Sequence, residues 1–129
     1  MKKSIFTLLM VVAVFVACKK NSDKKPDNNS RTVRYEITGA FSGPTLMVSY
    51  TTATGGTAND PVASLPWTKE ITYATNVAAA IVAISGNGGV AGQKVTIVVK
   101  RGGSQVGVPI DAVADASGSF SKSAPAIVF

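Results

Sequence analysis

The sequence contains no histidine and a single cysteine, Cys18, among its 129 residues. Without an imidazole, catalysis of the Ser-His-Asp or Cys-His kind is excluded. Zinc sites built from cysteine and histidine are excluded as well, and one cysteine cannot form an internal disulfide. No long helical periodicity runs through the chain. The length suits one small domain, whose stability has to come from packing.

The basic character of the chain is confined to its first third. The formal net charge is +6, which by itself would favour binding to nucleic acid. Residues 1–18 carry two lysines, and residues 19–34 carry six basic side chains against two aspartates. Residues 35–129 carry five basic and five acidic side chains and are neutral. We therefore expect no nucleic-acid partner for the main part of the chain.

The N-terminus has the pattern of a signal peptide. Lys2 and Lys3 precede an apolar or weakly polar run over residues 5–17, which would be about 20 Å long as a helix. That is too short to cross a hydrocarbon core of about 30 Å and is typical of the apolar part of a secretory signal. A buried core helix is the alternative, but the run lacks the periodicity of one. Residues 1–17 are therefore predicted to be a signal peptide.

Cys18 stands directly at the end of that apolar run, after Ala17. The segment resembles a bacterial lipobox, in which a small residue precedes a cysteine whose thiol is diacylated and which becomes the new N-terminus. Phe15 departs from the leucine usually found three positions before the cut, although it also disfavours ordinary signal peptidase. The alternative is that Cys18 is incidental. The sequence predicts lipid attachment at Cys18, with two or three acyl chains holding the protein on a membrane.

The segment that follows is predicted to be a disordered tether. Residues 19–32 contain no aromatic or large aliphatic side chain and cannot bury enough surface to offset the entropy of ordering. Its lysines either contact anionic lipid head groups or are solvated. Lys19 stands where an aspartate would favour retention in the inner membrane. The expected location is therefore the bacterial cell envelope, at the outer membrane, facing either the periplasm or the cell surface.

From Val33 onward the hydrophobic pattern has a period of two. Alternation or short apolar runs predict strands near residues 33–38, 46–51, 67–73, 77–84, 95–99 and 106–110, and again from 120 to the C-terminus. Residues 59–61, Asn-Asp-Pro, are predicted to be a turn before the third of these strands. Residues 77–84 are nearly all apolar, which fits a strand buried on both faces or a short helix; the neighbouring turn favours the strand. About seven short strands within residues 33–129 predict an all-β, immunoglobulin-like antiparallel sandwich, with a core packed around Trp67.

Two motifs have both a functional and a structural interpretation. Residues 65–67, Leu-Pro-Trp, could present Trp67 as an interface anchor, but a strand start with Trp67 in the core is preferred. Asp111 and Asp115, with Ser117 and Gly118, could suggest a calcium loop. Their spacing lacks the alternating acidic ligands of such a loop, so a turn closed by Asp115 and Gly118 is preferred.

The remaining polar motifs do not assemble a catalytic set. Glu36 and Glu70 could form the carboxylate pair of a glycosidase, but each lies on an alternating strand beside basic residues, which fits cross-strand pairing. Residues 86–89 and 102–103 are glycine-rich without the Lys-Ser/Thr of a phosphate loop and are predicted to be turns. Neither Lys94 nor Lys100 is paired with a nucleophile. No catalytic residue, cofactor or metal is therefore predicted.

Four segments resemble the MmpS-like family of small envelope proteins. They are residues 33–39 (VRYEITG), 48–50 (VSY), 65–70 (LPWTKE) and 95–99 (VTIVV). The resemblance implies an immunoglobulin-like sandwich that accompanies an MmpL transporter of the RND superfamily. Mycobacterial members carry a transmembrane helix where this chain has Cys18. The expected function is a lipid-anchored, non-catalytic accessory or binding module. The alternative is a surface-exposed lipoprotein that binds an extracellular ligand or supports envelope structure.

The lipid anchor can be tested at its attachment residue. Because the thiol of Cys18 is the only one in the chain, the Cys18→Ala variant is expected to lose metabolic labelling with palmitate completely. Labelled protein would be measured after immunoprecipitation from cells. The variant's total expression, measured by immunoblot, serves as the control. Undiminished labelling of the variant would refute lipidation at this residue.

Overall fold

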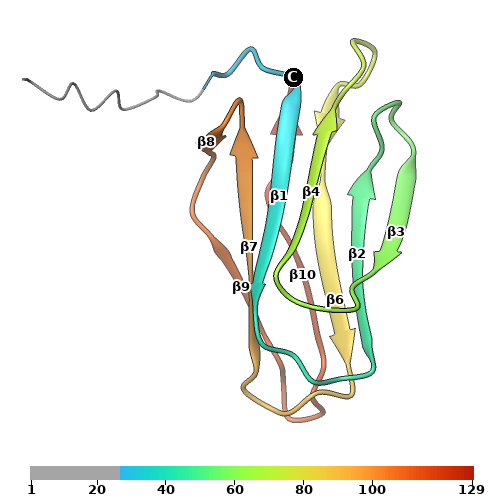
Figure 1. Cartoon of the computed structure of the whole chain (residues 1–129), viewed down its shortest axis with the longest axis vertical. Coiled ribbons are helices and arrows are strands. Elements are labelled where there is room, and N and C mark those ends of the chain that lie inside the picture. Colours follow the sequence, from blue (N-terminus) through green and yellow to red (C-terminus); the bar gives the residue numbers. More distant parts are fainter. Residues whose placement is uncertain (1–26) are drawn as a thin grey trace, which may run out of the picture.

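The computed structural model describes residues 27–129, which form an all-β, two-layer antiparallel sandwich (Figure 1). This confirms the fold class predicted from the period-two pattern. The predicted signal peptide, Cys18 and the first part of the predicted tether lie outside the described residues. Within residues 27–129 no helix is long and apolar enough to cross a membrane.

The first layer is a five-stranded sheet in which β1 and β7 are central. Its strands are β1 (Thr32–Gly39), β4 (Trp67–Thr72), β7 (Lys94–Arg101), β8 (Ser104–Gln105) and β9 (Ile110–Val113). The order is β4-β1-β7, and β8 and β9 pair with successive parts of β7. Gly102 and Gly103, both with positive φ, form the two-residue turn between β7 and β8, as predicted.

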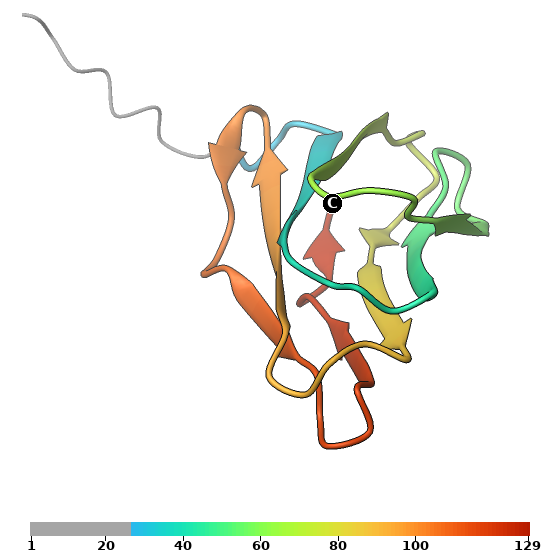
Figure 2. The same cartoon turned by 60° about the horizontal axis from the view of Figure 1, so that its bottom comes forward.

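The second layer is a four-stranded sheet with the order β10-β6-β2-β3. Its strands are β2 (Thr45–Thr51), β3 (Thr57–Pro61), β6 (Val82–Asn87) and β10 (Phe120–Ser123). A small separate pair joins β5 (Ala79–Ala80) to β11 (Ile127–Val128). Figure 2 shows the two layers facing each other, with β7 in orange on one side and β2 and β6 in teal and yellow on the other.

The core lies between the layers and is mainly aliphatic. Alternate residues of β1 point inward, and Val33, Tyr35 and Ile37 are at most 1% exposed. Val48 of β2 and Ile84 of β6 meet them from the opposite layer with the same degree of burial. Successive side chains of a strand point to opposite faces, so one face of each central strand lies in the core. This is why the alternation of apolar residues in the sequence predicted these strands.

Trp67 is not the centre of this core. It pairs with Ile37 and points inward, but β4 is the edge strand of its sheet, so the indole is only half-buried. Its ring lies 6.3 Å from that of Tyr50 in the opposite layer. The preference for a core role over an exposed anchor therefore holds in part, while the expectation of a core built around Trp67 was wrong.

Three strand boundaries differ from those predicted. Residues 59–61 were expected to be a turn but belong to β3, where an edge position tolerates Pro61. The expected strand 77–84 is broken at Ile81, which is 49% exposed. Its carbonyl accepts a hydrogen bond from the N–H of Thr51, and its N–H donates to the hydroxyl of Thr51. The expected strand 106–110 is not continuous, because residues 107–109 leave the edge of β7 and pairing resumes at Ile110 in β9. Alternation alone does not reveal where the pairing is interrupted.

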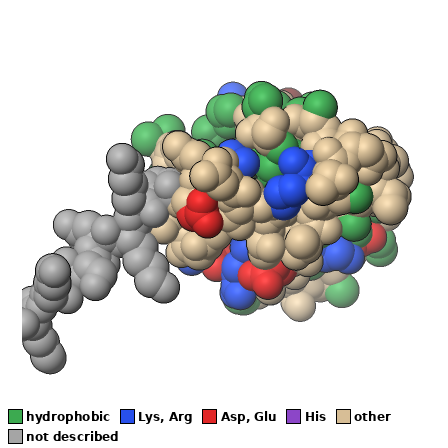
Figure 3. Space-filling view, turned by 90° about the horizontal axis from the view of Figure 1, so that it is seen from above, with side chains coloured by type: hydrophobic (Ala, Val, Ile, Leu, Met, Phe, Trp, Pro, Cys, Tyr) green, Lys and Arg blue, Asp and Glu red, His purple; other side chains and the backbone are tan. Residues whose placement is uncertain are grey.

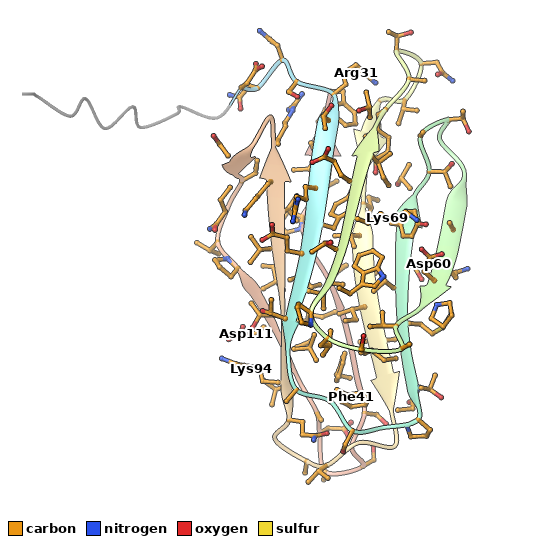
Figure 4. The ribbon with its side chains drawn as sticks, viewed as in Figure 1. Arg31, Phe41, Asp60, Lys69, Lys94 and Asp111 are labelled. Carbon is orange, nitrogen blue, oxygen red and sulfur yellow. The ribbon has the colours of Figure 1, made fainter. Side chains whose placement is uncertain are left out.

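Residues 27–32 were predicted to belong to the disordered tether, but the end of this segment is part of the folded domain. Thr32 begins β1, and the half-buried guanidinium of Arg31 donates hydrogen bonds to the carbonyls of Tyr73, Ala74 and Val77. Three carbonyls on one loop are thereby satisfied by one side chain. Arg31 fixes the entry of the chain at what we call the tether end of the sandwich, at the top of Figure 4.

A hydrogen-bonded pair of tyrosines connects the two layers near the same end. The hydroxyl of Tyr73 donates to the carbonyl of Thr51 in β2 at 2.9 Å. The hydroxyl of Tyr35 in β1 lies 2.9 Å from that of Tyr73, to which it donates, since the proton of Tyr73 is already used. Burial is the main cause that raises the pKa of both phenols. Ionisation of either one would break this link.

These raised pKa values predict loss of stability in alkaline solution. In the unfolded chain a tyrosine loses its proton above about pH 10, whereas folded Tyr35 keeps its proton. The free energy of unfolding should therefore be unaffected by Tyr35 below pH 10 and fall above it, by up to about 1.4 kcal/mol per pH unit for this group. Tyr35→Phe should make the alkaline fall shallower by that slope. Denaturant titrations from pH 8 to 12 measure it, and equal slopes for the two proteins would contradict the prediction.

Candidate functional site

The end of the sandwich opposite Arg31 carries a cleft between two loops. β1 runs from Arg31 at the tether end to Phe41 just beyond its other end (Figure 4), a span of about 26 Å for eight strand residues. We call this the distal end. Its cleft, of about 340 Å³, is lined by residues 39–43 and 62–65 together with Leu46 and Gln93. Buried Leu46 and Val62 form its apolar floor, and the serines at 42 and 64 are exposed.

One side chain joins the loops of the distal end. The side-chain oxygen Oε1 of Gln93 accepts hydrogen bonds from the backbone N–H and hydroxyl of Ser42, at 3.1 and 3.2 Å, and from the N–H of Val90 at 3.0 Å. The loop after β1 and the loop before β7 are therefore held by one acceptor. The cleft wall is fixed although it is built from loops.

Glycines provide the space for the aromatic side chain behind this cleft. The rings of Phe41 and Phe120 meet edge to face at 5.0 Å. A Cβ at Gly86 would lie 2.8 Å from both rings, and one at Gly89 would lie 2.3 Å from the ring of Phe41. Neither distance is possible for real side chains, so both residues must be glycine for Phe41 to pack here. The predicted turn at residues 86–89 is confirmed in part: Gly86 lies in β6, and the turn follows it.

The lateral edge of the sandwich, between β3 and β4, carries a polar cluster formed by Asp60, Lys69 and Tyr50. Nζ of Lys69 lies 3.2 Å from the carboxylate of Asp60 and 5.0 Å from the ring centroid of Tyr50, whose hydroxyl donates to the same carboxylate at 2.8 Å. The hydrogen bond from Tyr50 is the largest cause lowering the pKa of Asp60. The cluster is internally satisfied. It places inward-pointing charges on two edge strands, which opposes edge-to-edge association.

Glu36 and Glu70 lie on the outer face of the first sheet, diagonally across β1 and β4. Glu36 forms ion pairs with Arg34 and Lys100, each at 2.9 Å. The hydrogen bond from Lys100 is the main cause that lowers the pKa of Glu36. A glycosidase acid needs a raised pKa, so the geometry fits the cross-strand pairing that the sequence favoured.

Asp111 and Asp115 are each committed to local partners. Asp111 accepts a hydrogen bond from Thr96 at 2.7 Å and pairs with Lys94 at 3.1 Å across β7 and β9. Asp115 accepts hydrogen bonds from the N–H groups of Ser117 and Ser119, and its own carbonyl accepts from the N–H of Gly118. The predicted turn closed by Asp115 and Gly118 is therefore confirmed. No group of three or more potential acidic, cysteine or histidine ligands occurs within residues 27–129.

Several residues that shape the two ends were not singled out in the sequence. Arg31 was counted with the tether, and Gln93 and Phe41 lie in loops without a motif. Arg101 was counted only as one of the five basic side chains of residues 35–129, but it is only 8% exposed. The one usable signal was alternation, since Arg101 shares the phase of Val95, Ile97 and Val99 and so points inward.

The glycine beside the distal aromatic pair offers a stability test with a matched control. Gly86→Ala should destabilise the protein by about 1–3 kcal/mol, because the new methyl group would clash with Phe41 and Phe120. Gly56→Ala adds the same group at an exposed site where the nearest atom, Oγ1 of Thr52, lies at 3.3 Å. It should change stability by less than about 1 kcal/mol. Urea unfolding of the two variants compares them directly, and an equal loss in both would refute the packing argument.

Comparison of the chain with protein-family models, with curated proteins and with solved structures finds no match. The resemblance of residues 33–129 to the MmpS-like family therefore stays a prediction. What the chain does has to be argued from its own geometry.

Proposed function

We propose that this protein is a lipid-anchored, non-catalytic binding module of the bacterial cell envelope. Cys18 would provide the anchor, and the distal cleft would contact a partner protein in the envelope. The observation that carries the proposal is the placement of the cleft and the chain entry at opposite ends of β1. A module tethered by its N-terminal side presents its other end to the surroundings.

The length of chain between anchor and domain supports this arrangement. Eight residues lie between Cys18 and Asp27, so the tether end cannot lie farther than about 30 Å from the lipid anchor. The sandwich adds the length of β1, about 26 Å. The distal cleft would therefore reach partners beyond the membrane surface, while the tether end stays near it.

The state of the acidic side chains supports a binding role over catalysis. Glu36, Asp60 and Asp111 each have a lowered pKa and a basic partner, and Asp115 has a lowered pKa within its turn. All are thereby held ionised, whereas general acid catalysis at neutral pH requires a raised pKa. The chain also contains no histidine that could replace them.

The partner we favour is an RND transporter of the MmpL kind, as the resemblance to the MmpS-like family suggests. The alternative is a surface-exposed lipoprotein whose cleft binds an extracellular ligand or an envelope component. The mixed lining, with an apolar floor and the polar groups of Ser42 and Ser64 at the rim, suits a protein loop in either case.

Site-specific photo-crosslinking in living cells tests the proposal. A photoreactive amino acid at Ser64, an exposed residue of the cleft, should give a discrete adduct with an envelope membrane protein. The matched position is Thr54, exposed in the β2–β3 turn at the tether end, which should give none. Adducts are measured by immunoblot and identified by mass spectrometry.

The result separates the alternatives. An adduct with an RND transporter at Ser64 supports the accessory role. Adducts with extracellular material, together with digestion of the protein by protease on intact cells, support the surface-exposed alternative. Equal adducts at both positions, or none at Ser64, would contradict a binding role for the distal cleft.

A further inference from the structure

A second cavity opens between the two layers on the side away from β3 and β4. It has a volume of about 380 Å³ and lies under the segment that leaves the edge of β7 between β8 and β9. Its walls are aliphatic and are formed chiefly by Val99, Val106, Val108, Ile110, Ala124 and Ile127. No charged side chain lines it. An apolar cavity of this size is within the range of small-molecule sites.

The mouth of this cavity exposes apolar surface. Val108 lines the cavity and is 77% exposed, and Val128, next to Ile127, is 69% exposed. Val106 is held in place by its backbone N–H, which donates to the carbonyl of Val99 at 2.8 Å. The opening is thus fixed by backbone pairing, and aliphatic side chains are presented to water at its rim.

A nearly buried positive charge lies near the tether end of this cavity, although its side chain is not part of the lining. Arg101 follows Val99 by two residues on the inward face of β7, about 7 Å farther along the strand. Its Nη1 donates to the carbonyl of Val128 at 3.1 Å, and its Nε donates to that of Ser30 at 2.7 Å. The guanidinium therefore lies one residue beyond Ile127, at the tether end of the cavity.

This charge has no anionic partner in the part of the chain that the structure describes. Neither Arg101 nor Arg31 forms an ion pair there, and both guanidiniums stack on the ring of Phe129, at 5.0 and 4.4 Å. Nη2 of Arg101 has no hydrogen-bond partner among residues 27–129. Every fully buried side-chain nitrogen or oxygen of those residues has one, so Nη2 must be accessible to solvent.

Figure 3 looks onto this end of the molecule and shows basic side chains on either side of a hydrophobic patch. A largely buried guanidinium near an aliphatic cavity, with one nitrogen open to solvent, complements a ligand with an anionic head and an alkyl chain. A neutral alkane would leave the charge unpaired, and a cationic amphiphile would meet repulsion.

We propose that this cavity binds the alkyl chain of a fatty acid, with the carboxylate at Arg101. The inference adds a ligand to the proposed binding module, but it rests on a different surface from the distal cleft. The ligand would enter near the membrane, because Arg101 lies at the tether end. Binding of a fatty acid does not require that the distal cleft have a partner.

Photolabelling of the full lipid-anchored chain in nanodiscs tests this proposal. A photoreactive palmitate analogue should label the tryptic peptides 102–122 and 123–129, which contain most of the cavity wall. Val108→Asp should reduce that labelling by about tenfold or more, because a carboxylate at the rim repels the ligand and opposes entry of the chain. Val108 is exposed, so the variant should fold. Val90→Asp is the matched control at another exposed valine, 61% accessible, and should label normally.

Head-group analogues complete the test. An alkyl-trimethylammonium probe of equal length should label these peptides at least about tenfold less than the palmitate analogue. Equal labelling by the two probes, unchanged labelling of Val108→Asp, or labelling of peptide 70–94 instead would overturn the proposal. So would equal labelling by a two-chain phosphatidylglycerol analogue. Acyl groups attached at Cys18 are found on a different peptide, so failure here is distinguishable from failure of the anchor or of the distal cleft.

Discussion

The pairing of β1 between β4 and β7 is the constraint on which the rest of the structure depends. β1 is hydrogen-bonded along both edges, and its inward residues are almost completely buried. A strand so fixed has one register, since a slip by one residue would turn Val33, Tyr35 and Ile37 to water. Its two ends then fix the positions of the tether entry at Arg31 and of the distal loop at Phe41.

The two open sides of the sandwich, where the edges of its layers meet, differ in chemistry. At β3 and β4 the gap between the layers is filled by Asp60 and Lys69, whose charges neutralise each other and resist strand addition. On the opposite side residues 107–109 leave the edge of β7, and an aliphatic cavity remains. The charge beside it, on Arg101, is balanced only by carbonyls and an aromatic ring among the described residues. One edge is therefore closed and self-satisfied, and the other is suited to a ligand.

The fold could be predicted from the sequence because its central strands alternate cleanly. Up to Ile37 in β1, and throughout β2 and β7, every second residue is buried, as the alternation of apolar residues in the sequence indicates. The strand boundaries were harder to predict from the sequence, because β3 contains Asn59, Asp60 and Pro61, which are typical of turns. They are tolerated because β3 lies at an edge, and no local property of the residues states that. The same holds for Trp67, whose inward direction was predictable but whose half-burial depends on its edge position.

The sequence by itself determined the period of the strands, the neutral charge of residues 35–129 and the absence of histidine chemistry, because these are properties of composition and local order. It also predicts a lipid anchor, from the position of Cys18. Only the tertiary structure decided that Gln93 joins two loops, that Gly86 and Gly89 make room for Phe41, and that Arg101 lies near an apolar cavity. These contacts join residues far apart in the chain, and their partners are selected by the packing of the two layers, which local pattern does not encode.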